Sequence, residues 1–231
     1  MDTWGDLFER ASAVETDVAT IRERLAARRE DGDERNGRGD RDAAERNDRN
    51  ERNERDERDA ADRGESNEET TGGHGTMAET DPTRVAAGAD VLAADLLIGG
   101  PARETLDHVR GHDWLTLVAS DPLVGDTEAI VSSLADDDLA GVWRARIDED
   151  RHRVEHPEGD HPALASAIAG KAGHVLTFDE RLTGPKAGVS LQRYAISVRT
   201  PAAFATVFDP AAVYEGLVGD SYPGPDADPR G

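Results

Sequence analysis

Four aspartates after residue 90 stand at the ends of predicted strands or near the starts of predicted helices. They are Asp95, Asp126, Asp160 and Asp179. Asp179 directly follows an apolar run at 174–178, and Asp126 lies six residues after Ser120, where another predicted strand ends. In an open α/β sheet, functional sites form outside the carboxyl ends of the strands. We therefore expect the four carboxylates to lie together around one site.

A cluster of these acids would need divalent metal ions. The sequence has no lysine or arginine at matching positions to neutralise them, and like charges at close range resist joint ionisation. Hard oxygen ligands suit Mg²⁺ or Mn²⁺, and two such ions can activate a water and stabilise the leaving oxygen of a phosphodiester. The acids therefore predict metal-dependent phosphodiester hydrolysis. The hydroxyl groups of Ser120 and Thr177 would hold carboxylates or a substrate phosphate.

The elements that position these residues alternate along the chain. Strands are predicted at 90–98, 114–120, 174–178 and 194–200. Helices are predicted after Pro101, in "DTEAIVSSL", at 162–172, in "PAAFATVF" and in "PAAVYEGLV". Such alternation predicts an α/β fold with a parallel central sheet covered on both faces. We expect one domain at 81–219, followed by a flexible tail at 220–231.

Over roughly residues 88–210 the sequence resembles PIN-domain nucleases. That family has an Asp closing its first strand, a Ser followed six residues later by an acid, an Asp opening a small-residue helix, and T-x-D after the next strand. The matching residues are Asp95, Ser120 with Asp126, Asp160 with Ala163 and Ala167, and Thr177 with Asp179. The resemblance implies a three-layer α/β/α PIN-like fold and an endoribonuclease that binds Mg²⁺ or Mn²⁺ through the four aspartates. It implies RNA as the substrate and allows an antitoxin or another protein as a partner.

The sequence departs from the family pattern in three places. The hydroxyl residue usual after the first Asp is missing from "DLLIGG". Glu128, two residues beyond Asp126, is an alternative second acid, and 140–159 is an irregular insert relative to compact members. The missing hydroxyl supports an alternative function, a non-catalytic PIN-like scaffold or RNA-binding module acting through the N-terminal helix.

The segment 143–153 concentrates arginine beside a tryptophan, Trp143. Its candidate RNA-binding residues are Arg144, Arg146, Arg151 and Arg153. Arginine and aromatic side chains contact phosphates and stack on unpaired bases. The alternative is that Trp143 lies in the core of a strand or helix and that the arginines pair with neighbouring acids.

The N-terminal region is expected to be separate from this domain. Apolar residues spaced three and four apart predict one amphipathic helix within residues 1–29. That helix would form a coiled coil with a second copy, which we favour, or dock on a partner or on the C-terminal domain. Residues 30–80 are rich in Arg, Asn, Asp and Glu with almost no aliphatic residue, which predicts a disordered linker.

Composition sets the remaining expectations. The chain has 49 acidic and 27 basic residues, only two of them lysines, which is typical of proteins adapted to high salt. It contains no cysteine, so disulfides and cysteine-type zinc sites are excluded. His152, His156 and His161 fit surface positions in a loop better than a zinc site. With no long apolar run or signal pattern, we expect a cytoplasmic protein without membrane contact.

Overall fold

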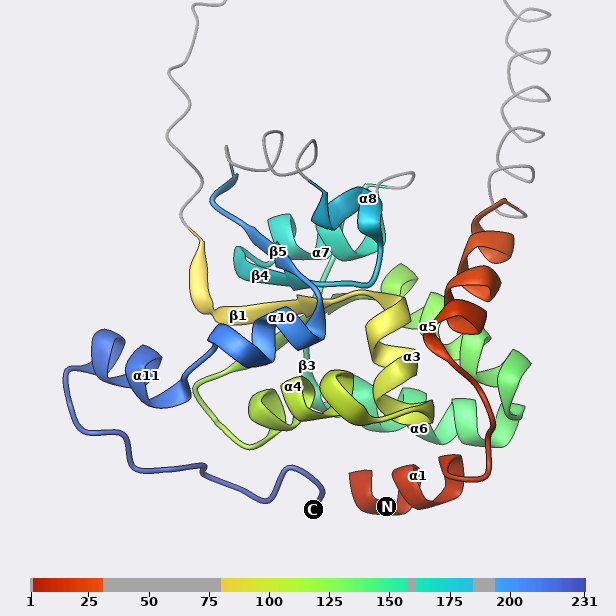
Figure 1. Ribbon diagram of the computed structural model, residues 1–231, viewed down its shortest axis with the longest axis horizontal. Coiled ribbons are helices and arrows are strands. Elements are labelled where there is room, and N and C mark those ends of the chain that lie inside the picture. The colour runs from red at the N-terminus through yellow and green to blue at the C-terminus, as the bar shows by residue number, and fades with distance from the viewer. Residues whose placement is uncertain (1, 31–79, 158–160, 185–193) are drawn as a thin grey trace, which may run out of the picture. The chain divides into compact units, whose positions relative to one another are not determined.

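The computed structural model describes residues 2–30, 80–157, 161–184 and 194–231. Its central element is a five-stranded, all-parallel sheet with the strand order β3-β2-β1-β4-β5 (Figure 1). The strands are β1 (Asp81–Ala87), β2 (Thr116–Ser120), β3 (Arg151–Val154), β4 (Ala172–Leu176) and β5 (Ser197–Arg199). The expected α/β fold with a parallel sheet flanked by helices is confirmed.

The middle of the sheet is made of short, buried aliphatic runs. Val85 of β1 lies opposite Leu117 of β2, and Ala86 lies opposite Val175 of β4. These side chains are buried because helices cover the sheet. Parallel strands that are covered on both faces lack a polar face. The chain order reverses between β1 and β4, so a crevice is expected where these two strands end. We call the side at which all five strands end the carboxyl edge.

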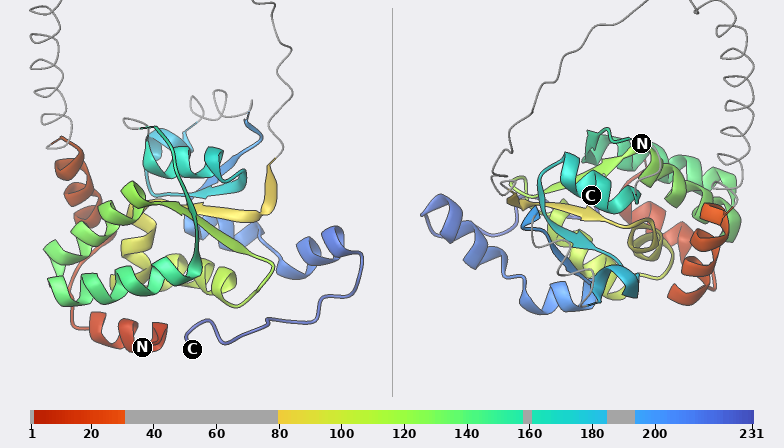
Figure 2. Two further views of the ribbon diagram at one scale, coloured as in Figure 1. Left: turned by 180° about the vertical axis from the view of Figure 1, so that it is seen from behind. Right: turned by 90° about the horizontal axis from the view of Figure 1, so that it is seen from above.

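The helices of the domain connect the strands and cover the sheet. They are α3 (Ala89–Leu97), α4 (Gly100–Arg110), α5 (Asp121–Leu134), α6 (Asp137–Asp150), α7 (Pro162–Ala169), α8 (Glu180–Thr183), α10 (Pro201–Val207) and α11 (Pro210–Val218). Helix α7 packs on β1, β2 and β4, while α4 and α10 pack together across the sheet from it (Figures 1 and 2). Helices α3, α5, α7, α8 and α10 each begin at the carboxyl edge, directly after a strand or a short loop.

Two predicted elements are wrong. Residues 90–98 form most of helix α3 instead of the first strand, and that strand lies earlier, at Asp81–Ala87. Every residue of α3 is buried, so the helix has no polar face and its sequence reads like a buried strand. The supposed irregular insert at 140–159 contributes most of α6 and all of β3.

The N-terminal region is also different from the single helix that was predicted. Helix α1 (Trp4–Ala11) ends before residue 12, and a second helix begins at residue 18 and continues to residue 30. A capping box between Thr3 and Asp6 fixes the start of α1. Most of the predicted linker, residues 31–79, lies outside the described residues.

The apolar stripe of α1 is buried against the domain itself. Trp4, Leu7 and Phe8 join the main core, and α1 packs on α6 and α3. The Trp4 indole Nε1 donates to Asp150 at 2.6 Å. Residues up to Leu25 belong to the same compact unit as the C-terminal domain. Of the three predicted arrangements of the N-terminal helix, docking on the C-terminal domain is therefore the one observed. The apolar stripe that was expected to mediate self-association is buried.

Within the described residues, no helix combines the length and the apolar composition that crossing a bilayer requires.

We predict that Trp4→Ala lowers the free energy of unfolding by about 3–5 kcal/mol, because it empties a packed site. It also removes the hydrogen bond to Asp150. Glu9→Ala, on the exposed side of the same helix, should change stability by no more than about 0.5 kcal/mol. Chemical denaturation in concentrated KCl measures both. Equal midpoints for Trp4→Ala and the unsubstituted protein would mean that α1 is not docked in solution.

Candidate functional site

At the carboxyl edge a threonine hydroxyl joins two acids. Thr177 Oγ1 donates to Asp90 Oδ2 at 3.1 Å and accepts from the Asp179 backbone N–H at 3.0 Å. All three residues are buried, and they follow or adjoin the ends of β1 and β4. Thr177 and Asp179 thus lie at the edge where the sequence predicted them, and Asp90 takes a place beside them that was not predicted.

The Asp90 carboxylate connects the start of α3 to the end of β4. Besides Thr177, it accepts from the backbone N–H of Phe178 at 2.8 Å and of Val91 at 2.9 Å. Its residue is only 3% exposed. Asp90 is not among the predicted site residues, because the sequence predicts a strand at 90–98 and these residues form part of α3. The helix dipole favours an acid in the first turn of a helix. The residues "GAD" before the run of small and aliphatic residues therefore indicate a helix that begins near Asp90.

Asp179 is the N-cap of α8 and forms an ion pair with an arginine two residues later. Its carboxylate accepts from the Arg181 guanidinium at 2.7 and 3.0 Å and from the Arg181 backbone N–H at 2.9 Å. The hydrogen bond from the Arg181 side chain lowers the pKa of the Asp179 carboxyl, against the opposing effect of its burial. Asp179 is therefore ionised and already paired, whereas the sequence analysis assumed no cation nearby.

Asp95 does not end a strand, and its charge is not unpaired. It lies in α3, is 1% exposed, and forms a buried ion pair with Arg110 of α4. Arg103 donates to the Asp95 carbonyl oxygen at 2.7 Å. Burial raises the pKa of the Asp95 carboxyl and the charge of Arg110 opposes that rise. Both premises for a metal ion at Asp95, its strand-end position and its free charge, are wrong.

The remaining predicted acids that the structure describes do not complete a metal-binding cluster. Asp126 and Glu128 lie in α5 and are half-buried, and Glu128 pairs with Arg144 at 3.3 Å. Asp160 lies outside the described residues. Ser120 closes β2 and caps α5, and its hydroxyl is 2.9 Å from His156 Nε2.

The predicted arginine cluster is mostly engaged with acids. Trp143 is fully buried, Arg144 pairs with Asp148 at 2.8 Å, and Arg146 pairs with Glu149 at 3.4 Å. The alternative that places Trp143 in the core and pairs its arginines with acids is therefore confirmed.

Arg151 and Arg153 of the same cluster share Asp121 as a partner. The Arg151 guanidinium is buried and contacts Asp121 at 2.5 Å and the Ala119 carbonyl oxygen at 2.9 Å. The hydrogen bond from Arg151 lowers the pKa of the Asp121 carboxyl. Arg153 also pairs with Asp121, and its side chain is 64% exposed. Arg153 is thus the member of the cluster most available to a ligand.

These residues do not fit a two-metal centre. Among the residues that the structure describes, no group of three or more His, Asp or Glu side chains could hold a metal ion. The PIN pattern closes the first strand with an acid, whereas β1 ends at Ala87 and the first acid after it is Asp90. A Cβ atom at Gly88 would lie 2.4 Å from Asp90 Oδ1, so no side chain fits there unless Asp90 moves.

Three comparisons with known proteins give one match. The family model that matches residues 79–230 is described as a family of unknown function (DUF7384). The comparisons with curated proteins and with solved structures found no match.

We predict that Thr177→Val lowers stability by about 1–3 kcal/mol, because it removes the hydroxyl that accepts from the buried Asp179 backbone N–H and thereby takes one hydrogen bond away from the Asp90 carboxylate. Thr206→Val is the matched control, since Thr206 is exposed on α10 and its hydroxyl donates only to the carbonyl of its own helix. Denaturation curves that coincide for the two variants would contradict the structural role of Thr177.

We predict that Arg110→Leu costs about 3–5 kcal/mol at neutral pH, because it leaves Asp95 charged and buried. Removing Arg110 also raises the pKa of Asp95 further. A carboxyl group whose pKa is higher in the folded than in the unfolded protein stabilises the folded state increasingly as the pH falls. The deficit should therefore shrink between pH 7.5 and pH 5. Arg230→Leu, which removes an exposed partner of Asp107, should cost less than about 1 kcal/mol. A deficit independent of pH would mean that Asp95 is not left charged.

Proposed function

We propose that this chain, which belongs to the DUF7384 family, is a PIN-like module that binds RNA at its carboxyl edge without cleaving it. The observation that carries the proposal is that the two acids at the ends of β1 and β4, Asp90 and Asp179, are both already engaged by protein donors. A two-metal mechanism needs carboxylates from several strand ends around both ions. The described residues supply two such acids, Asp90 and Asp179, and both are already hydrogen-bonded.

The carboxyl edge retains features that suit a phosphate backbone. Helices α3, α5, α7, α8 and α10 begin there, and helix N-termini attract anions through their free N–H groups and their dipoles. Two arginines with exposed side chains flank the edge, Arg153 at 64% and Arg181 at 82% exposure. Because exposed ion pairs contribute only about 0–1 kcal/mol, a phosphate can replace Asp121 as the partner of Arg153 at little cost, and Asp121 keeps its contact with Arg151.

A second candidate function is the metal-dependent ribonuclease predicted from the sequence. It is supported by Thr177 and Asp179, which lie at the edge together with Asp90. Hydrolysis with Mg²⁺ or Mn²⁺ would require further ligands, and Asp126 and Asp160 are the acids of the PIN pattern that remain to supply them. Since the described residues do not form such a ligand set, we place binding without cleavage first.

The test is RNA binding by fluorescence anisotropy across a KCl series, starting at the lowest concentration that keeps the protein folded. Arg153→Ala and Arg181→Ala should each weaken binding of a labelled single-stranded RNA. Each should also reduce the salt slope by about 0.7, as expected for one lost phosphate contact. Arg230→Ala, which removes another exposed arginine, is the control.

Gel analysis of the same RNA with Mn²⁺ separates the two candidates. We expect intact RNA with the unsubstituted protein. Mn²⁺-dependent cleavage that Asp179→Asn abolishes would refute binding without cleavage and establish the nuclease. Absence of both binding and cleavage would contradict both functions.

A further inference from the structure

Helix α10 and the helix after it are held on the domain by few buried side chains. Helix α10 buries Pro201 and Phe204, and every residue of α11 is half-buried or exposed. Phe208, directly after α10, is partly buried and packs against the core. A segment with so few buried apolar contacts opens at a lower free-energy cost than the buried central strands. Residues 201–218, which we call the cover segment, therefore depend mainly on two phenylalanine rings.

Both rings lie against histidines from other elements. Phe204 and Phe208 stack on each other, with 4.6 Å between the ring centres. The His174 ring of β4 is steeply inclined to both, at 5.2 Å from Phe204 and 6.3 Å from Phe208. The His108 ring of α4, the helix on which α10 packs, lies 6.1 Å from Phe208 (Figure 1). Two imidazole rings thus form part of the surface that receives the cover segment.

The surroundings of His174 oppose a positive charge on its ring. Burial lowers the pKa of His174, the charge of Arg199 on β5 lowers it further, and the Pro82 backbone on β1 has a smaller opposing effect. Its Nδ1 is buried and makes no hydrogen bond within the described residues. A protonated imidazole needs partners for two N–H donors, so the docked state favours the neutral ring.

His108 is also held below its ordinary pKa. Burial lowers the pKa of His108, and the neighbouring His112 lowers it further, against the charges of Asp107 and Glu104 on the same helix. Residues 201–208, which pack on α4, contain no charged side chain that could stabilise an imidazolium. The cover segment therefore presents apolar rings to two histidines that are neutral while it is docked.

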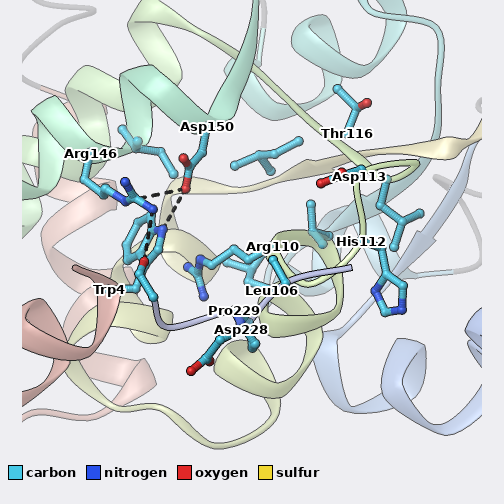
Figure 3. Close-up of a pocket in the computed structure, with 16 residues that line it drawn as sticks. Trp4, Leu106, Arg110, His112, Asp113, Thr116, Arg146, Asp150, Asp228 and Pro229 are labelled. Atoms are coloured by element: carbon cyan, nitrogen blue, oxygen red, sulfur yellow. Dashed lines mark hydrogen bonds and ion pairs between the residues drawn. The ribbon is translucent and has the colours of Figure 1, made fainter. Parts of the chain in front are cut away.

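A cavity of about 590 Å³ beside α4 does not extend to these two rings (Figure 3). Among the described residues, its lining includes His112 and neither His108 nor His174. Water in the cavity therefore contacts His112, whereas the other two rings face phenylalanines.

We propose that protonation of His108 and His174 releases the cover segment while the rest of the domain stays folded. Both histidines have a lower pKa in the docked than in the released state, so the released state binds protons more strongly. Their contribution to docking is complete above about pH 6.5, the ordinary pKa of histidine, and is lost as the pH falls below it. Each proton taken up raises the opening constant by up to about tenfold per pH unit.

Hydrogen exchange of the full chain in 2 M KCl at pH 7.5 and pH 5.5, corrected for the intrinsic pH dependence of exchange, measures the release. The backbone N–H groups of Phe204 and Phe208 donate to the carbonyls of Thr200 and Phe204 at 2.9 and 2.8 Å, so they report on α10. Their protection should fall by at least about fivefold, and by at most about a hundredfold, the limit for two protons over this range. The N–H groups of β1 should remain better protected than those of α10 at both pH values.

Substitution of the histidines identifies the groups responsible. His108→Gln and His174→Gln should each remove part of the pH dependence, and the double variant should abolish it, because glutamine does not titrate. His152→Gln is the matched control, since His152 is exposed on β3 and should leave the pH dependence unchanged.

Three results would overturn the proposal. Protection of α10 that stays constant or rises on acidification would show that the phenylalanine rings accept the charged imidazoles. Equal protection of α10 and β1 would show that the cover segment opens only when the whole domain unfolds. An unchanged pH dependence in either single variant, or in the double variant, would assign the release to other groups.

Discussion

The buried ion pair between Asp95 and Arg110 holds together the helices on one side of the sheet. A buried carboxylate is destabilising unless a cation and hydrogen bonds compensate it, so α3 and α4 must pack with these two side chains in contact. The Arg110 guanidinium then presents a flat face on which the Trp4 ring stacks, and Arg103, which bonds the Asp95 carbonyl, lies over Phe8 in the same way. The docking of α1 follows from this pair.

Part of the fold and of the candidate site could be read from the sequence. β2 and the second half of β4 lie within the apolar runs predicted as strands, and Thr177 and Asp179 follow β4 as the pattern indicated. Helix α3 could not be read in the same way, because all its residues are buried and the chain shows no helical alternation there. The misplaced first strand made Asp95 seem to lie at the sheet edge and concealed Asp90.

The pairing of charges was the second limit on prediction. Glu128 meets Arg144 across sixteen residues, and Asp121 meets Arg151 across thirty. The neighbouring residues in the sequence do not reveal these ion-pair partners, because only the packing of α5, α6 and β3 brings them together. In a chain with this many acids, an aspartate that looks unpaired is weak evidence for a metal ion.

The bond between Trp4 and Asp150 joins residues 146 positions apart, and this separation has a kinetic consequence. Closing so long a loop costs entropy before its contacts form, which slows folding steps that depend on it. During synthesis α1 leaves the ribosome before α6, so its binding surface is incomplete until α6 has emerged. The Trp4 and Phe8 side chains therefore remain exposed to solvent and to chaperones for most of translation. Docking of α1 is then among the last steps in the maturation of the nascent chain.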